Sequence, residues 1–138
     1  MGVGPNYVLN KGFLAQTPVT AYAAGLVVTY GTVEQSCITL SAASSLLPLG
    51  ILTDDIDAAK IATGKAFVGV ALLGLVRAKV GAAVTKGDRL TNDTSSRVIT
   101  QTRAAAGAQP LPVVGIAQTA ATAANQFIDV LLTPGASF

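Results

Sequence analysis

Two similar segments, each about 60 residues long, follow one another in the sequence, and this repeat limits what the chain can fold into. The first segment contains a Gly-Ile pair at Gly50 and, after an Asp- and Ala-rich turn, an apolar run that starts at Phe67. The second contains the same pair at Gly115 and a run that starts at Phe127, so the numbering offset is 65 at the glycine and 60 at the phenylalanine. Because a unit of about 60 residues buries only a weak core alone, the repeat predicts two units that share one fold.

The similarity extends upstream of these runs. Residues 25–26 and 37–39 correspond to residues 87–90 and 98–100, with a numbering offset near 62. The repeat therefore covers about 25–73 and 87–132, within a single β-barrel-like domain over residues 21–138. A chance likeness between two β segments of simple composition is the alternative to a duplication. Two paired units can close a small barrel or a sandwich and so remove exposed sheet edges.

Short runs rich in Val, Ile, Leu and Thr recur between turn residues at the regular spacing that is typical of all-β proteins. The predicted strands are 26–30, 37–40, 49–52, 65–73, 74–80, 97–100, 113–118 and 127–133. Within 74–80, alternation puts Arg77 and Lys79 on one face and apolar side chains on the other. At most two short helices are expected, at 54–62 and 120–125, and 103–112 is expected to be a surface loop. The predicted fold class is all-β, a small barrel or sandwich built from two similar units.

Residues 1–20 are expected to form an extended N-terminal arm. This segment has two Pro, little periodicity and a few isolated apolar side chains. Such a segment would have little order on a lone globule.

The composition excludes most catalytic chemistry. The chain has no His and one Cys, so a Ser-His-Asp triad, a Cys-His pair and the usual His-based zinc site are all ruled out. A single Cys also rules out a disulfide framework within the chain. We therefore expect a protein that is not an enzyme and that has no cofactor and no metal.

The charge content points to extensive contacts with other proteins. The chain is 51% hydrophobic and 12% charged, about half the charged fraction of an ordinary soluble domain. Such a thin coat of charge predicts a surface covered by other copies or by a larger assembly. A net charge of +2 with scattered Lys and Arg gives no reason to expect nucleic acid. The apolar run 66–76 is shorter than the about 20 residues that span a bilayer, and no signal peptide is expected.

A few residues are candidates for a chemical role. Asp54, Asp55 and Asp57 could ligate a hard cation, but they lack the spacing of a calcium loop, and capping or turn formation is the simpler interpretation. Residues 87–93 are interpreted as a hairpin turn. Cys37 is expected to be a small buried hydrophobe.

The order of these elements resembles the small capsid cement, or head decoration, proteins of tailed bacteriophages. The resemblance covers about residues 26–133 and rests on turn-and-strand patterns. They are the Gly-Ile pair at 50–51, the Val-x-Val strand at 68–70, the Lys-Gly-Asp-Arg-Leu segment at 86–90, the second Gly-Ile pair at 115–116 and the strand 128–132. The resemblance implies a structural protein, commonly a trimer, at three-fold and quasi-three-fold positions outside the mature icosahedral head, which it stabilises against internal pressure.

The implied partners are the major capsid protein and other copies of this chain, with no nucleic acid and no membrane, and the implied location is the outer surface of the virion. Because the arm is more apolar than a free tail, we expect it to contact the capsid. The candidate contact residues are Asn6, Tyr7, Leu9, Lys11, Phe13 and Leu14. Three arms on a trimer would strengthen attachment by multivalency. The alternatives are another virion component, such as a head-fibre or tail protein, and a small non-catalytic partner-binding β-barrel.

Overall fold

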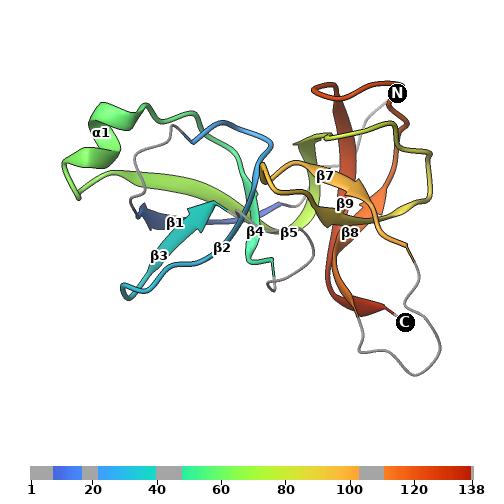
Figure 1. Ribbon diagram of the computed structural model, residues 1–138. Coiled ribbons are helices and arrows are strands. Elements are labelled where there is room, and N and C mark those ends of the chain that lie inside the picture. Colours follow the sequence, from blue (N-terminus) through green and yellow to red (C-terminus); the bar gives the residue numbers. More distant parts are fainter. Residues whose placement is uncertain (1–7, 17–21, 40–47, 103–110, 138) are drawn as a thin grey trace, which may run out of the picture.

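The computed structural model describes residues 8–16, 22–39, 48–102 and 111–137, and it has two lobes joined by one long strand (Figure 1). In chain order the elements are β1 (Leu9–Ala15), β2 (Val27–Tyr30), β3 (Ser36–Thr39), β4 (Gly50–Leu52), α1 (Ala58–Ala62), β5 (Phe67–Lys79), β6 (Arg89–Asn92), β7 (Val98–Thr100), β8 (Leu111–Ala117) and β9 (Phe127–Ser137). Apart from the short helix α1, all the regular secondary structure in the described residues is β-strand.

The first lobe is a closed five-stranded barrel, which we call the first unit. Its strand order is β1-β3-β2-β4-β5, and β1 also pairs with β5. The β1–β3 pairing is parallel and the β1–β5 pairing is antiparallel, so the ring closes through β1. Closure leaves this ring without an unpaired edge. The Val- and Ile-rich strands suit this strongly curved surface because β-branched side chains pack well on a pleated sheet.

Strand β5 is 13 residues long and belongs to both lobes. Residues 67–73 complete the first unit, and residues 74–79 pair with β9 to begin the second. Its even-numbered side chains point inward in both lobes: Val68, Val70 and Ala78 are buried, whereas Arg77 is exposed. The predicted alternation over 74–80 is confirmed, but the two strands expected at 65–73 and 74–80 are one continuous strand.

The second lobe, which we call the second unit, has the strand order β5-β9-β8-β6-β7. An isolated parallel bridge joins Val80, just beyond β5, to Val98 in β7. The amide of Gly81 also donates to the carbonyl of Val98 at 2.8 Å. The last strand of this sheet therefore folds back toward the first, as β3 meets β1 in the first unit.

The two units have the same strand register. The equivalent pairs are Val28 with Gly50 and Leu90 with Gly115, Ile51 with Ala71 and Ile116 with Leu131, and Tyr22 with Ile56 and Val84 with Ala121. The numbering offset between each residue of the first unit and its equivalent in the second is close to the offset that the sequence repeat shows. The prediction of an all-β fold built from two similar units is confirmed.

Close approach of the backbone explains why the Gly-Ile pair occurs in both units. A Cβ atom on Gly50 would overlap the carbonyl oxygen of Ala71, and a Cβ atom on Gly115 would overlap the carbonyl oxygen of Leu131. Only glycine lets these neighbouring strands pair at this register.

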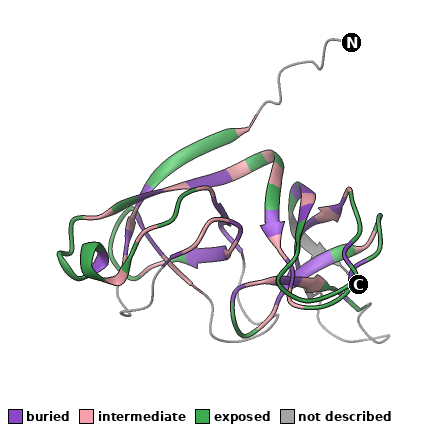
Figure 2. Ribbon diagram, turned by 90° about the horizontal axis from the view of Figure 1, so that it is seen from above, coloured by how far each residue is buried: buried purple, intermediate pink, exposed green. Residues whose placement is uncertain are grey.

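Two clusters of buried side chains fill the lobes, and buried and exposed residues alternate along the strands (Figure 2). The cluster of the first unit is Phe13, Ala15, Tyr22, Val28, Cys37, Leu49, Leu52, Ile61, Val68 and Val70. The cluster of the second unit includes the equivalents of most of these, namely Ala78, Val80, Val84, Leu90, Val98, Val114, Ala117, Ile128 and Val130. Large aromatic side chains therefore lie only in the first of these two clusters.

The structure corrects the expectation of an N-terminal arm over 1–20. Residues 9–15 form strand β1, whose last residues Phe13 and Ala15 are buried in the barrel. Residues 1–7 and 17–20 lie outside the described residues. In the repeat, β1 is the equivalent of residues 74–80, so it is part of the first unit and not an addition to it.

Four smaller expectations also change. The helix α1 is shorter than 54–62, because it begins after Asp57, which accepts from the amide of Lys60 at 2.9 Å. Residues 120–125 form turns and no helix. Strand β6 was missed, since residues 89–92 lie within the segment interpreted as a turn. The predicted loop 103–112 lies mostly outside the described residues, and its last two residues begin β8.

Candidate interaction surfaces

The junction between the units is an apolar contact. Three side chains of the first unit, Val27, Ile51 and Ala71, face away from its barrel and are fully buried within the core cluster of the second unit. Two backbone hydrogen bonds cross the junction. The amide of Val27 donates to the carbonyl of Ser96 at 2.7 Å, and the amide of Lys79 donates to the carbonyl of Gly25 at 2.9 Å.

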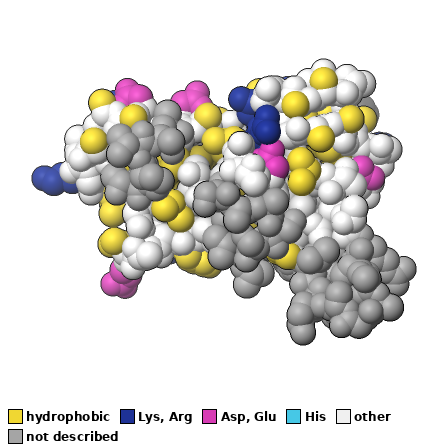
Figure 3. Space-filling view, viewed as in Figure 1, with side chains coloured by type: hydrophobic (Ala, Val, Ile, Leu, Met, Phe, Trp, Pro, Cys, Tyr) yellow, Lys and Arg dark blue, Asp and Glu magenta, His cyan; other side chains and the backbone are white. Residues whose placement is uncertain are grey.

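A row of neighbouring side chains on the outside of the second unit is exposed or half-buried instead, and we call it the outer row of the second unit. It consists of Leu75, Leu131, Ile116 and Arg89, each directly opposite the next on adjacent strands. Leu75 is 36% exposed and Leu131 is 40% exposed. Hydrophobic side chains are visible on both lobes between a few charged groups (Figure 3). Leu75 and Leu131 are therefore adjacent exposed leucines on neighbouring strands.

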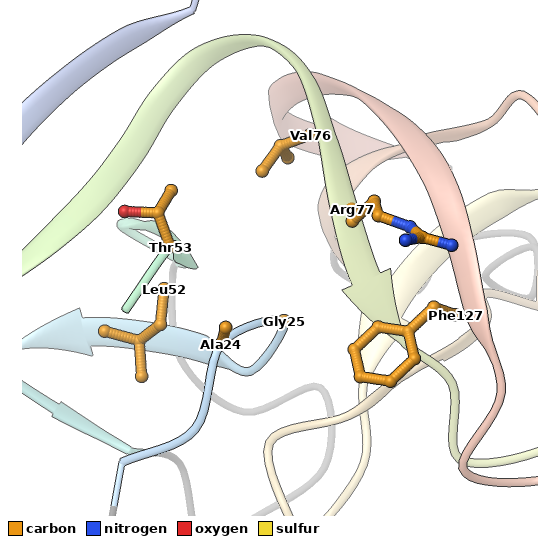
Figure 4. A pocket seen from close by; sticks show the side chains of 7 residues that line it. All are labelled: Ala24, Gly25, Leu52, Thr53, Val76, Arg77 and Phe127. Carbon is orange, nitrogen blue, oxygen red and sulfur yellow. The ribbon is translucent and has the colours of Figure 1, made fainter. Parts of the chain in front are cut away.

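A pocket of about 370 Å³ lies beside the junction. Its lining is Ala24, Gly25, Leu52, Thr53, Val76, Arg77 and Phe127 (Figure 4). Arg77 is its one charged lining residue, and its guanidinium lies 5.8 Å from the centre of the Phe127 ring. The lining offers an apolar surface and one cation, with no pair of groups for acid–base chemistry.

The predicted capsid-contact residues fall in three classes. Asn6 and Tyr7 lie outside the described residues. Leu9 and Lys11 are exposed on β1, and Leu14 is half-buried. Phe13 is 5% exposed and belongs to the core of the first unit, so it is not available on the surface of the folded chain. This part of the prediction is corrected because β1 closes a barrel.

The three neighbouring aspartates act on the backbone. Asp54 accepts from the amide of Gly69 at 2.9 Å, Asp55 from the amide of Ala24 at 2.7 Å, and Asp57 caps α1. In the described ranges, no three His, Cys, Asp or Glu side chains are grouped as metal ligands would be. No helix in the described part of the chain is long and apolar enough to span a membrane.

Cys37 is fully buried, as expected for a small hydrophobe. Burial raises the pKa of its thiol from 9.0 to about 11. Burial, together with the neighbouring Cys37, raises the pKa of Tyr22 from 10.0 to about 12. The Tyr22 hydroxyl donates to the carbonyl of Gln16. These two groups are therefore neutral parts of the core and are poor candidates for a reactive site.

The outer row was missed by sequence reasoning. The signal was the repeat itself, because aligning 27 with 89 and 71 with 131 pairs side chains of different polarity and size. The packing of the two units decides which of the equivalent side chains is buried and which is exposed. The periodicity of the sequence does not reveal this packing.

The fold defines a class of protein: an all-β chain of two five-stranded units that share one strand. No protein-family model matches the sequence, and no curated protein matches it. Among solved structures, the N base of the head fiber protein gp8.5 of bacteriophage phi29 is similar in fold, with a TM-score of 0.61. The sequences are 16% identical, and the match covers 92% of this chain and 95% of that chain.

Proposed function

We propose that this protein is a structural component of a bacteriophage virion and attaches to the head. The observation that carries the proposal is the similarity in fold to a head-fiber base over nearly the full length of both chains. An independent observation supports it: the resemblance to head decoration proteins rests on the strands and turns that form the two units. The proposed role is non-catalytic and needs no cofactor, since the chain lacks His and its buried thiol and phenol are held neutral.

Within this role we favour the base of a head fibre, located on the outer surface of the virion and bound to the major capsid protein. The rigid double unit suits a base, because the continuous β5 and the apolar junction hold the two lobes in one arrangement. We propose a homotrimer, with no nucleic acid or membrane among its partners.

A cement, or decoration, protein is the second candidate. It is favoured by the low charge content and by the exposed leucines of the outer row, which suit a protein covered by neighbouring subunits. A cement protein binds neighbouring capsid subunits and stabilises the shell, whereas a fibre base only needs to bind the shell.

Co-sedimentation with expanded phage heads stripped of their surface proteins tests the proposal. Saturable binding is expected, and unexpanded heads serve as the control. The temperature at which the shell breaks then separates the two candidates: a cement protein raises it and a fibre base leaves it unchanged. Absence of binding to stripped, expanded heads would contradict both and favour a partner-binding barrel with another target.

A further inference from the structure

We propose that the outer row of the second unit binds the free end of the first unit in another copy of this chain, so that copies associate head to tail. The contact would reproduce between two chains the apolar part of the junction that joins the two units within one chain. This inference specifies the surface for the self-association in the proposed function, and it does not depend on binding to heads.

The two units present equivalent outer rows. In the first unit the row is Asn10, Ala71, Ile51 and Val27, and in the second it is Leu75, Leu131, Ile116 and Arg89, joined by the same strand pairings. Three of the four residues in the first row are fully buried by the second unit. The second row is built on the same backbone pattern, but Leu75, Leu131 and Arg89 are exposed and Ile116 is half-buried.

Two glycines show the same difference beside the rows. Gly25 and Gly87 are equivalent and have φ angles of 91° and 92°. A Cβ atom on Gly25 would lie 2.9 Å from the Phe127 ring, because the second unit packs there. A Cβ atom on Gly87 would have nothing within 4 Å. Gly87 thus has the same backbone conformation as Gly25, and the space that the Phe127 ring fills beside Gly25 is open beside Gly87.

The first unit exposes the aromatic part of the matching half of the junction, and we call this surface its free end. Within the chain the second unit contributes Phe127, Lys79 and Ser96 to the junction. Their equivalents in the first unit are Phe67, Leu14 and Gln35, which define the free end. The amide of Leu14 donates to the carbonyl of Gln35 at 2.8 Å within this unit, so the free end offers the Phe67 ring and not the two backbone hydrogen bonds of the junction. Phe67 is 63% exposed at the start of β5, at the end of the lobe that points away from the second unit (Figure 1). An exposed aromatic ring and an outer row with two exposed leucines are thus both present on one molecule.

Charge complementarity supports the same pairing. Within the chain, Val27 bonds to Ser96, and their equivalents are Arg89 on the outer row and Gln35 on the free end. Glu34 precedes Gln35 and is exposed, so the contact would bring Arg89 close to a carboxylate.

A contact between two different surfaces of the same chain relates each copy to the next by a rotation. When that rotation closes, the copies form a ring, and a ring of three copies would be the proposed trimer.

Sedimentation velocity of the purified chain over a range of concentrations tests the contact. The wild type is expected to associate reversibly. Leu131→Asp is expected to weaken association by about tenfold to a hundredfold, because it places a charge at the centre of the contact. Thr94→Asp is the matched control, since it adds the same charge at an exposed turn of the same unit. A wild type that stays monomeric, or equal association by the two variants, would overturn the inference.

A charge exchange covers the case in which Leu131→Asp disturbs the fold. Arg89→Glu and Glu34→Arg are each expected to weaken association, and the double variant is expected to recover it. No recovery, with all variants folded by circular dichroism, would count against the contact. Head binding is scored separately by co-sedimentation, so a failure of self-association and a failure of the proposed function give different results.

Discussion

The two units share a register and differ in what covers them. In the first unit Ile51 and Ala71 face outward and are fully buried, because the second unit packs over them. In the second unit their equivalents Ile116 and Leu131 lie on the outside, and Leu131 is 40% exposed. The same backbone position is therefore an internal junction in one unit and an external surface in the other, which shows that register alone does not determine the role of a surface.

The turns that cap the units differ in a complementary way. In the first unit Gln16 reaches from the end of β1 and accepts from the amide of Thr32 at 2.7 Å. In the second unit Asp93 accepts from the amide of Ser95 at 2.8 Å and forms an ion pair with Arg97 at 2.8 Å. Gln16 of the first unit is equivalent to Gly81 of the second, and Asp93 of the second unit is equivalent to Gly31 of the first. A Cβ atom on Gly31 would overlap the side-chain oxygen of Gln16, and a Cβ atom on Gly81 would overlap the carboxylate of Asp93. Each unit thus has one side chain that accepts hydrogen bonds from the turn, and the residue opposite it is a glycine that leaves room for this side chain.

The largest effect is expected from a charge in the shared strand. Val70→Asp places a carboxylate at a fully buried position of β5. The cost of at least about 4 kcal/mol is comparable with the total stability of a small domain, so the chain is expected to be unfolded by circular dichroism. Val33→Asp, at an exposed turn, is the control. A soluble β-rich Val70→Asp variant would contradict the position of β5 in the core.

Substitution of the recurring glycines tests the equivalence of the units directly. Gly50→Ala and Gly115→Ala each force a Cβ atom against a backbone carbonyl. Each is expected to lower the free energy of unfolding by about 2 to 4 kcal/mol in urea titrations. Gly64→Ala is the control, since a Cβ atom there meets nothing, and only its φ of 70° is unfavourable. A large loss in one unit and none in the other would break the comparison.

The exchange of acceptors predicts a rescue. Gly31→Asp alone is expected to destabilise the first unit, because the Cβ atom of the new side chain would overlap the Ser36 hydroxyl and the Gln16 side chain. When it is combined with Gln16→Gly, which removes the Gln16 overlap and leaves the acceptor on the same strand as in the second unit, about 1 to 2 kcal/mol is expected to return. A double-mutant cycle in urea measures the coupling. Additive losses would mean that the two turns are not equivalent.

Alkaline pH is expected to affect the first unit most. Cys37 and Tyr22 have pKa values raised from 9.0 and 10.0 to about 11 and 12, so the folded state holds their protons more tightly than the unfolded state. The contribution of these two groups to the free energy of unfolding is fully present below their ordinary pKa values, and it is lost as the pH rises through about 11. Urea titrations of the wild type and Cys37→Ala over this range should give a shallower decline for the variant, by on the order of 2 kcal/mol. Parallel declines would exclude Cys37 as a source of the pH dependence.

Much of the fold could be predicted because the repeat carries a backbone constraint. Gly50 and Gly115 are required by close approach of the strands, so the Gly-Ile pairs stay recognisable where other side chains differ. β1 could not be recognised in this way. Its sequence contains Asn, Lys and Gly, and its role as the closing strand depends on pairings with β3 and β5 that are distant in sequence.

The candidate surface was harder to predict than the fold. Phe13 has the appearance of an arm anchor in the sequence, but closure of the barrel buries it. Asp54 and Asp55 do not start the helix because they already accept from backbone amides of Gly69 and Ala24. The exposed row of the second unit becomes visible only when it is compared with its buried equivalent, and that comparison needs the packing of the two units.

Electron cryomicroscopy of expanded heads saturated with the protein tests the proposed function most directly. We expect ordered density for both units on the outside of the shell, in contact with the major capsid protein. We also expect the outer row of each second unit to lie against the first unit of a neighbouring copy. Saturated heads with no added density on their outer surface would contradict the proposal that this chain is a structural protein of the virion head.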